Sequence, residues 1–591
     1  MDTEQSSQSQ PVTSNSKVVY MAAKEVVVNK ETKNTMVAAT AAGAYLPACV
    51  WGDFFVTYTP SLSQRSEEWM RERADELKGQ VRRMFVTGGK DMSIADMLSL
   101  VDTLKRLGID NHFHEEIDLA LSHIHTEDQD NFHGSNDLHV VALRFGLLRQ
   151  HGLWVSADVF DKFRDAMGSF SMDLATDSKG LLSLYNAAHM AVPGEAVLDD
   201  AVAFARRHLE AAKGKLIRSP MVEQVSRALN TPRPRWPRRL EAMHYITEYE
   251  QEDEHNAIIL ELARLDFSIV RSVYIEEIKN LSLWWRDLYN DVKLPYARNR
   301  IVETHLFSSG VFPEKEHSRA RIIFTKTFAF LSLMDDTYDT HATLEECQKL
   351  TEAIQRWDES MVPILPEYLR MFYIKLLRNY KEIEEDILEP WEKNRMADFK
   401  KSFKLVSKSY LKEAEWFSQN YTPSFKEHID FSITSTGLPM LSHVALMGAG
   451  QLATKEAFDW ALDMPDLVKG MAETGRFFND ISSYYKPRNS LKDVVSSLEC
   501  YMKEHDMTPN DATVAFETMV EHAWRRINKA YMELDHGILP AAQVVVNMAR
   551  TVQMFYRHGR DEHGIYGRDA YTFGDTLKET IASLLLKDFP I

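Results

Sequence analysis

The most informative stretch of the chain is Ile322-Ile-Phe-Thr-Lys-Thr-Phe-Ala-Phe-Leu-Ser-Leu-Met-Asp335-Asp-Thr-Tyr-Asp339. Its apolar residues recur at helical intervals, which predicts a buried helix. Side chains three or four positions apart share one helix face. Counting back from Asp339 therefore gives a single stripe of Asp335, Leu331, Phe328 and Phe324. We expect an apolar helix face that ends in two carboxylates one turn apart.

Two carboxylates at that spacing repel each other, so folding alone does not favour them. A magnesium ion would resolve the conflict, because it prefers oxygen ligands and commonly uses one or two carboxylates together with substrate phosphates. The alternative is a solvated helix end with surplus acids, in a chain that contains 87 Asp and Glu residues. This motif alone leaves both interpretations open.

A second polar motif is Arg476-Phe-Phe-Asn479-Asp480-Ile-Ser-Ser483. On a helix, Arg476, Asn479 and Ser483 share one face, which continues backwards through Gly475, Ala472 and Met471. Small residues beside oxygen ligands would leave room for a bound molecule, whereas tight helix packing is the alternative. A third motif, Tyr296-Ala-Arg298-Asn-Arg300, places two arginines where they can reach one ligand from a loop. Arginine suits phosphate because its planar fork donates in parallel pairs; an ordinary salt-bridged loop is the alternative.

The composition limits the class of protein. A chain of 591 residues predicts two or more packed units. Gly (24) and Pro (20) are sparse, which favours helices. The formal net charge of −18 argues against nucleic acid or an anionic membrane as partner, so an anionic substrate would need a local positive pocket. Cys49, Cys347 and Cys500 predict neither a disulfide framework nor a metal site, and no apolar run reaches the length of a membrane span.

The opening of the chain is rich in Ser and Gln and has no Arg before Arg65. It fits neither an organelle transit peptide nor a secretory signal, so we expect a disordered tail over residues 1–40 and a cytoplasmic protein. Ordered sequence is expected to begin near Trp51, with helices over residues 67–85, 93–107 and 195–212. The proline-rich stretch 231–237 predicts a loop. A second run of helices extends from about Asn256 to Leu585.

Together and in this order, the three motifs resemble those of the plant terpene synthases, most of all the cytosolic sesquiterpene synthases. The resemblance extends from Trp51 onward and includes Leu184-Tyr-Asn-Ala-Ala-His-Met, Ser282-Leu-Trp-Trp-Arg-Asp-Leu288 and Ile354-Gln-Arg-Trp-Asp358. It implies an all-α fold with two helical domains. A vestigial, non-catalytic α-barrel would span residues 41–255, and a class I terpenoid synthase bundle would span residues 256–591.

The resemblance also implies roles for individual residues. Asp335 and Asp339 match the ligands of the family's aspartate-rich metal motif, and Asn479 and Ser483 match the first two ligands of its second metal motif. Arg298 and Arg300 match loop arginines that follow the departing diphosphate, and Arg476 matches a diphosphate-binding arginine. Phe307 and Phe328 are expected to line the pocket, Tyr556 and Asp561 match a Tyr and Asp near the C-terminal lid, and Ser435-Thr-Gly437 resembles a break in a pocket-lining helix.

The implied activity is that of a lyase that binds three Mg²⁺ ions, with Mn²⁺ as an alternative. It would ionise farnesyl diphosphate and steer the carbocation to a cyclic sesquiterpene, as a monomer. One position departs from the pattern, because Pro487 stands where the second motif has a metal-binding Glu. We expect weaker binding of one ion, which a magnesium titration of the native enzyme and of Pro487→Glu would test.

Several alternatives remain open at this stage. The chain could act on geranyl diphosphate, although Ala41 and Ala42 stand where monoterpene enzymes of this family carry a tandem Arg. A prenyl-chain elongase would carry two DDxxD motifs, and a class II cyclase would carry a DxDD motif; neither pattern occurs. The non-enzymatic alternative is an impaired helical binding protein, for which Pro487 is the best argument. The histidine-rich stretch from His112 to His139 is interpreted as surface and core histidines and not as a metal site.

Overall fold

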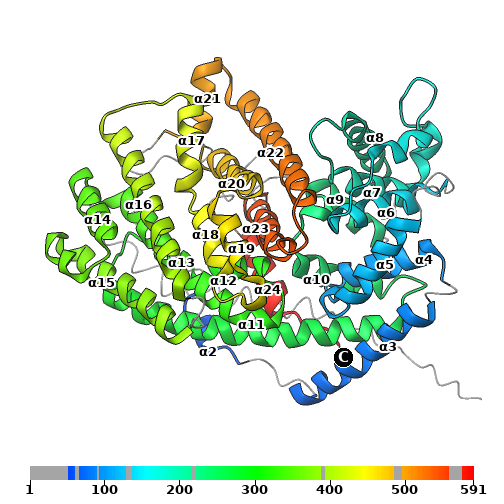
Figure 1. Cartoon of the computed structure of the whole chain (residues 1–591), viewed down its shortest axis with the longest axis horizontal. Helices are drawn as coiled ribbons and strands as arrows, with labels where there is room; N and C mark the ends of the chain where they lie inside the picture. Colours follow the sequence, from blue (N-terminus) through cyan, green and yellow to red (C-terminus); the bar gives the residue numbers. More distant parts are fainter. Residues whose placement is uncertain are drawn as a thin grey trace, which may run out of the picture.

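The computed structural model describes residues 51–59, 65–88, 92–127, 136–213, 220–387, 393–484, 495–557 and 575–590. These residues form an all-helical protein, as Figure 1 shows, and the predicted fold class is confirmed. Within the described ranges, the only strand-like pairing is an isolated bridge between Arg164 and Phe170. No described helix is both long and apolar enough to cross a bilayer. The predicted tail, residues 1–40, lies outside the described residues.

The helices of the first part of the chain gather on one side of Figure 1. They are α3 (Glu67–Gly88), α4 (Ile94–Arg106), α5 (His114–Glu127), α6 (Leu138–Gln150), α7 (Ser178–Ala188), α8 (Ala196–Lys213), α9 (Pro220–Asn230) and α10 (Arg238–Tyr249). The short helix α2 (Phe54–Thr57) lies apart from this group and packs against α11 (Ala257–Val292). The predicted helices over 67–85, 93–107 and 195–212 correspond to α3, α4 and α8. The proline-rich stretch 231–237 is mostly loop, as predicted, but it contains a single 3₁₀ turn, Arg233–Arg235, because the fixed φ of proline is compatible with that turn.

The second part of the chain forms a larger bundle. Its helices are α11, α12 (Ile301–Val311), α13 (Ser318–Asp336), α14 (Leu344–Arg356), α15 (Glu367–Glu382), α16 (Met396–Ser418), α17 (Phe425–Ser435), α18 (Leu438–Leu446), α19 (Lys455–Leu462), α20 (Asp466–Tyr484), α21 (Ser497–His505), α22 (Pro509–Met532), α23 (Leu539–Arg557) and α24 (Asp575–Leu586). A π-helical turn, Thr337–His341, follows α13 directly. The domain boundaries proposed from the sequence stay a prediction.

Side-chain caps set where many of these helices begin. Ser93 accepts a hydrogen bond from the backbone N–H of Asp96 at the start of α4. Asn256 does the same for Ile258 and Ile259 at the start of α11, one residue from the predicted beginning of the second run. Thr343 and Glu346 form a reciprocal capping box at the start of α14. Each cap satisfies N–H groups that have no partner inside the helix.

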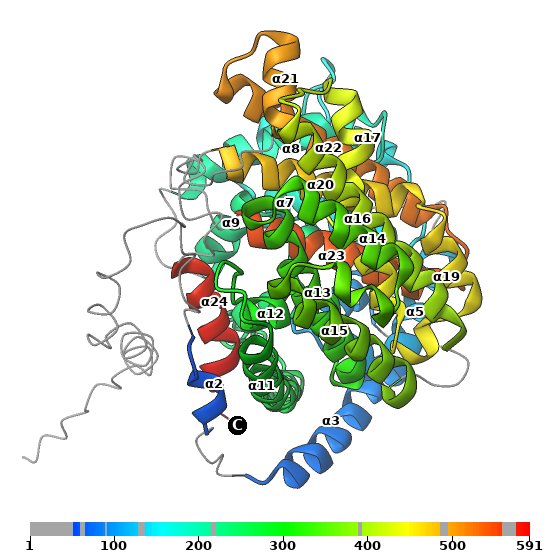
Figure 2. The same ribbon diagram turned by 90° about the vertical axis from the view of Figure 1, so that its left-hand side faces the viewer.

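Helix α11 connects the two parts of the molecule. At 36 residues it is about 54 Å long and runs along the base of both helix groups in Figure 1. Figure 2 views it nearly end-on, with α2 and α24 beside it. Segments from both ends of the chain therefore pack against one central helix, and Phe267 of α11 meets Phe589 with ring centroids 5.0 Å apart.

A buried ion-pair network fixes α13 against α11. Arg321 of α13 is fully buried and binds Glu277 of α11 through two hydrogen bonds of 2.8 and 2.9 Å. His305 of α12 contacts the same carboxylate at 2.7 Å. These partners hold the pKa of Glu277 near 2, below its ordinary value, although burial alone would raise it. The network positions the helix whose far end carries the predicted aspartates.

Candidate active site

A cavity of 230 Å³ opens within the second helix bundle, where α12, α13, α16, α20 and α23 meet. Its lining includes nine of the residues singled out from the sequence: Arg298, Arg300, Phe307, Phe328, Asp335, Asp339, Arg476, Asn479 and Tyr556. Asp335 and Asn479 therefore face one common cavity, as the sequence interpretation requires. Asp561 and Pro487 lie outside the described residues, so their predicted roles stay predictions.

The stripe predicted on residues 322–339 is present, with one local change. Leu331, Phe328, Asp335 and Asp339 all line the cavity, while Phe324 is fully buried behind it. The α-helix ends at Asp336 and continues as the π-helical turn that carries Asp339. Wider turns of this kind often occur at functional sites. Here the wider turn still leaves Asp339 in the wall beside Asp335.

Arg298 is held by the aspartates at the end of α13. Its guanidinium contacts Asp335 and Asp336, each at 2.7 Å, and its backbone N–H donates to Asp336 over 2.7 Å. The loop between α11 and α12 is thereby joined to the acidic end of α13. Arg300 lines the same cavity two residues further on, so both arginines reach one site from a loop, as predicted.

Carboxylates gather in and beside the cavity wall: Asp339 and Glu413 line the cavity, and Asp336 lies next to it outside the lining. Burial raises the pKa of Asp336 to about 6, even though Arg298 acts in the opposite direction. Burial and the neighbouring charge of Asp335 raise the pKa of Asp339 well above its ordinary value. On α16, burial raises the pKa of Glu413 to about 7. A divalent cation placed among these groups would reverse the shifts, because it favours the ionised form.

Helix α20 supplies the opposite wall. Arg476 donates to the Ser435 hydroxyl over 2.8 Å and contacts Asp480 at 3.2 Å. The amide oxygen of Asn479 accepts a hydrogen bond from the Tyr556 hydroxyl at 3.1 Å. The predicted ligand Ser483 does not line the cavity; its hydroxyl donates to the backbone oxygen of Asn479 over 2.6 Å, one turn back. Asn479 and Ser483 nevertheless stay on one helix face, next to each other.

The predicted helix break at Ser435-Thr-Gly437 is present between α17 and α18. Gly437 has φ of +71°, a conformation that glycine adopts readily and other residues rarely do. A Cβ at this position would stand 2.4 Å from a methyl carbon of Leu331 on α13. The break therefore depends on glycine, and it lets Ser435 and Thr436 line the cavity.

Aromatic rings form the deep end of the cavity. Phe307 meets Phe328 with ring centroids 5.4 Å apart and Phe555 of α23 also at 5.4 Å. Phe324 stacks behind Phe307 at 5.9 Å. Aromatic faces stabilise a nearby cation by roughly 0.5–2 kcal/mol each without offering a reactive lone pair. The wall thus combines a polar, charged mouth with an aromatic floor.

Several lining residues were not singled out from the sequence. Glu413 and Tyr410 lie on α16, an amphipathic helix whose other acids are similar, so no sequence signal separates them. Glu303 is different, because it is the only carboxylate in α12, a helix whose residues are almost all buried. A charged residue inside such a helix is a signal that could have been used. Its Oε2 atom has no hydrogen-bond partner, and burial raises its pKa.

Metal binding at this site would need ligands beyond the protein. In the ranges that the structure describes, no group of three or more His, Cys, Asp or Glu side chains is placed to hold an ion. Magnesium fits such a site, since it commonly takes one or two carboxylates and completes its shell with water and substrate phosphates. The stretch from His112 to His139 forms ordinary contacts where described, with His112 bound to Asp266 and His139 to Ser183.

The comparisons with known proteins agree with this geometry. Residues 286–526 match the family described as "Terpene synthase family, metal binding domain", and residues 50–229 match "Terpene synthase, N-terminal domain". The chain is 55% identical to a eudesmanediol synthase of Zea mays over 91% of its own length and 94% of that protein. It is 43% identical to a tau-cadinol synthase of Zea mays, over 92% of this chain and 97% of the relative.

Solved structures give the same result. The isoprene synthase of grey poplar, determined with three Mg²⁺ ions and dimethylallyl-S-thiolodiphosphate, is similar with a TM-score of 0.81 and 30% identity, over 88% of this chain and 97% of that one. A limonene synthase with 2-fluorolinalyl diphosphate also gives 0.81, at 27% identity over 93% and 99%. The fold, both matched domains and the relatives agree with the resemblance found in the sequence, and the chain belongs to the terpene synthase family.

Proposed function

We propose that this chain is a sesquiterpene synthase: it ionises farnesyl diphosphate with the help of Mg²⁺, converts the carbocation to a cyclic sesquiterpene and releases diphosphate. The observation that carries the proposal is the single cavity into which Asp335 and Asp339 face from one side and Arg476 and Asn479 from the other, above an aromatic floor. The names of the maize relatives support a sesquiterpene product.

The protein would bind the diphosphate end of the substrate at the mouth of the cavity. Asp335 and Asp339 would hold metal on one wall, and Asn479 would hold it on the other, where Ser483 would join once its hydroxyl releases the backbone oxygen of Asn479. When bound, Mg²⁺ supplies Lewis-acid stabilisation of the negative charge that develops on the leaving group. We propose three ions, the number in the isoprene synthase structure, with Mn²⁺ as an alternative metal. Arg300 and Arg476 would orient the diphosphate through their planar forks.

The hydrocarbon end would lie over the aromatic floor. Breaking the C–O bond would leave a carbocation beside Phe307 and Phe328, which line the cavity and carry no nucleophilic atom. The enzyme would thus act as a carbon–oxygen lyase, with no protein nucleophile. The carbocation then loses a proton or takes up water. Tyr556, which holds Asn479, would close the polar end over the substrate.

Product analysis tests this proposal directly. The purified full chain is incubated with geranyl, farnesyl or geranylgeranyl diphosphate in Mg²⁺, and the products are identified by gas chromatography with mass spectrometry. We expect the highest kcat/KM and a fifteen-carbon product with farnesyl diphosphate, and no product in EDTA. A preference for geranyl diphosphate would indicate a monoterpene synthase. Folded protein without any product would support the binding-protein alternative.

The monomeric state and the cytoplasmic location expected from the sequence are part of the same proposal. Light scattering behind size-exclusion chromatography tests the first, with one species near 68.1 kDa as the expected result. Fluorescence microscopy of the full chain carrying a C-terminal tag tests the second. A dimer or an organellar signal would contradict the respective part without affecting the catalytic proposal.

A further inference from the structure

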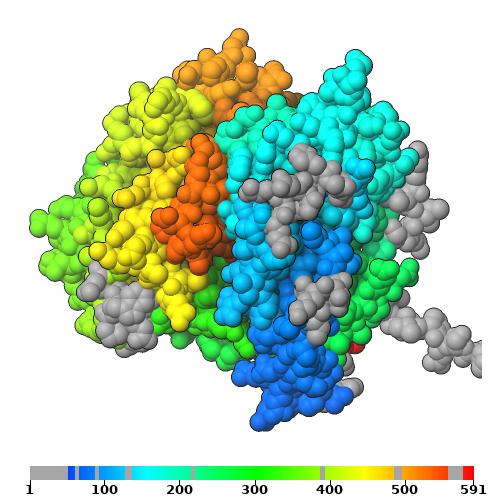
Figure 3. Space-filling model, turned by 45° about the vertical axis from the view of Figure 1, so that its right-hand side comes forward, coloured from blue at the N-terminus to red at the C-terminus, as the bar shows by residue number. Residues whose placement is uncertain are grey.

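A second cavity lies at the junction between the N-terminal helices and α23, and it shares no lining residue with the candidate active site. This junction cavity has a volume of 160 Å³ and is walled by α4, α6, α10, α23 and the residues around Arg233–Arg235. Figure 3 shows the orange C-terminal helices directly against the blue and cyan N-terminal ones. Because one water takes roughly 30 Å³ in the liquid, the cavity has room for a small polyatomic ion.

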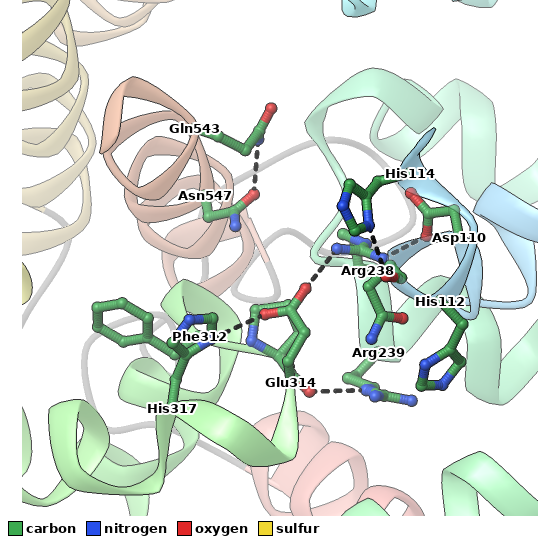
Figure 4. Close-up of polar contacts among 12 residues, drawn as sticks. Asp110, His112, His114, Arg238, Arg239, Phe312, Glu314, His317, Gln543 and Asn547 are labelled. Atoms are coloured by element: carbon green, nitrogen blue, oxygen red, sulfur yellow. Dashed lines mark hydrogen bonds and ion pairs between the residues drawn. The ribbon is translucent and has the colours of Figure 1, made fainter. Parts of the chain in front are cut away.

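The wall of the junction cavity carries more cations than anions. Each of its three carboxylates is already paired with arginine: Asp102 with Arg233, Asp110 with Arg238, and Glu241 with Arg106 and with Arg227 outside the wall. Figure 4 shows Arg238 between Asp110 and Glu314, at 2.6 Å from Glu314. Its single positive charge is therefore already matched by two carboxylates. Two further cations line the cavity, Lys105 and Arg550, and no carboxylate of the wall is left for them.

Lys105 projects from α4 into this cavity. Among the described residues it makes no hydrogen bond or ion pair; the acid that raises its pKa most is Asp110, which Arg238 already holds. Burial lowers the pKa of Lys105, and the charges of Arg238 and Arg550 act in the same direction. The Lys105 side chain is only partly exposed, and an ammonium group that loses part of its hydration without a partner is costly, so this position favours a bound anion.

Arg550 faces the cavity from α23. Its Nε donates to the backbone oxygen of Pro234 over 2.8 Å, and Nη1 donates to the amide oxygen of Asn547 over 2.9 Å. Figure 4 shows Asn547 and Gln543 on this face of α23. Both partners of Arg550 are neutral. Burial without a carboxylate lowers the pKa of Arg550 to about 10, in contrast to Arg238 and Arg239 nearby, whose acidic partners raise theirs.

We propose that the junction cavity is a binding site for a phosphate-type anion, held by Lys105 and Arg550. A guanidinium offers parallel donors to phosphate oxygens, and an ammonium adds a compact charge. The excess of cations is local, since the chain as a whole carries a formal charge of −18. Inorganic phosphate and inorganic diphosphate share this chemistry. The proposal stands on the charges of the cavity wall and not on the proposed function.

Calorimetric titration of the full chain in EDTA tests the site, because divalent metal would otherwise strengthen binding of the anion in the active site. Phosphate and diphosphate are titrated separately at constant ionic strength. We expect saturable binding in wild type and at least a tenfold weaker affinity in the Lys105→Met/Arg550→Met variant, since a charge-assisted hydrogen bond contributes about that much. If only phosphate or only diphosphate binds, the result identifies which of the two anions the site accepts and still supports the site.

Two matched variants locate the binding. Lys326→Met removes another partly buried lysine without a carboxylate partner, outside the cavity, and is expected to bind like wild type. Arg300→Gln/Arg476→Gln removes the two active-site arginines proposed to orient diphosphate and is also expected to retain binding at the junction cavity. Equal affinity in wild type and in Lys105→Met/Arg550→Met would overturn the proposal. So would loss of all binding in the active-site variant.

A crystallographic measurement covers the case in which the double variant does not fold. Crystals of the wild-type chain are soaked in tungstate, a phosphate mimic with strong anomalous scattering. A peak within hydrogen-bond reach of Lys105 and Arg550 supports the proposal. Peaks confined to the active site, or no peak at all, would refute it.

Discussion

Buried carboxylates occur in two regions of this protein, and their pKa values shift in opposite directions. Along α11, Glu277 is paired with Arg321 and His305, and its pKa falls to about 2. Around the active-site cavity, Asp336 and Glu413 are equally buried, yet their pKa values rise to about 6 and about 7. The residue type and the burial are similar in the two regions. The difference lies in the neighbouring acids: Arg298 and Arg476 contact Asp336 and Glu413, but the nearby charge of Asp335 raises the pKa of both.

The contrast suggests different roles for the two regions: the α11 network stabilises the fold, and the cavity acids serve the candidate site. Along α11 every buried acid has a cationic partner, as Asp266 has in Arg239 at 2.6 Å, so the network holds helices together without outside help. Among the residues that line the cavity the acids outnumber the arginines, so the excess negative charge favours protonation of the acids or binding of a cation. Perturbed pKa values of this kind are common at functional sites.

Removing one cavity acid is expected to have the largest effect. We predict that Asp339→Asn lowers kcat/KM for farnesyl diphosphate by about 10³-fold or more, because metal-assisted stabilisation of a leaving group contributes several kcal/mol. The fold should remain intact, because Asp339 makes no ion pair with any described residue. Steady-state kinetics and thermal unfolding of the same preparation check both statements. Activity within tenfold of wild type would contradict the assignment of Asp339.

Breaking the α11 network should lower stability and largely retain activity, which is the reverse of the effect expected for Asp339→Asn. We predict that Glu277→Gln destabilises the protein by about 3–5 kcal/mol, because Arg321 would be left as a buried charge without its partner. Thermal unfolding should move to a markedly lower temperature, while the activity of the folded fraction at low temperature is largely retained. The surface variant Glu345→Gln, which breaks an exposed pair with Lys349, is the matched control and should change little. Equal effects of the two variants would refute the role of the network.

The sequence predicted one side of this contrast much better than the other. The stripe ending in Asp335 and Asp339 was found because it depends on residues close together in the chain. The pair of Glu277 and Arg321 lies 44 positions apart, and nothing local marks either residue as the partner of the other. Glu413 was missed for the same reason: it reaches the cavity only through the packing of α16. Local periodicity predicts helices and faces, whereas long-range pairing requires the fold.

Acid should weaken the α11 network at a defined pH. Glu277 has its pKa lowered to about 2 in the folded protein, from 4.5. Its contribution is therefore fully present above about pH 4.5 and is lost as the pH falls towards 2. The shift corresponds to about 3 kcal/mol. We predict that the difference in unfolding temperature between wild type and Glu277→Gln, measured from pH 7 down to pH 3, narrows below pH 4.5. A constant difference over this range would contradict the assigned ionisation.

The smallest effect is expected when the Glu→Gln substitution is made in the cavity, at Glu413. Glu413 has its pKa raised to about 7, so its ionised form is disfavoured in the fold, and stability should fall as the pH rises through 7. Glutamine cannot ionise, and its amide oxygen can still accept the hydrogen bond that Ser435 donates to Glu413 over 2.5 Å. We predict that Glu413→Gln, measured in EDTA, stabilises the protein by about 1 kcal/mol at pH 8 and by almost nothing at pH 5. Arg476 limits the gain, because it contacts Glu413 at 4.0 Å and loses a charged neighbour. Destabilisation at pH 8 as large as that of Glu277→Gln would mean that both regions balance their charge alike, and the distinction between them would fail.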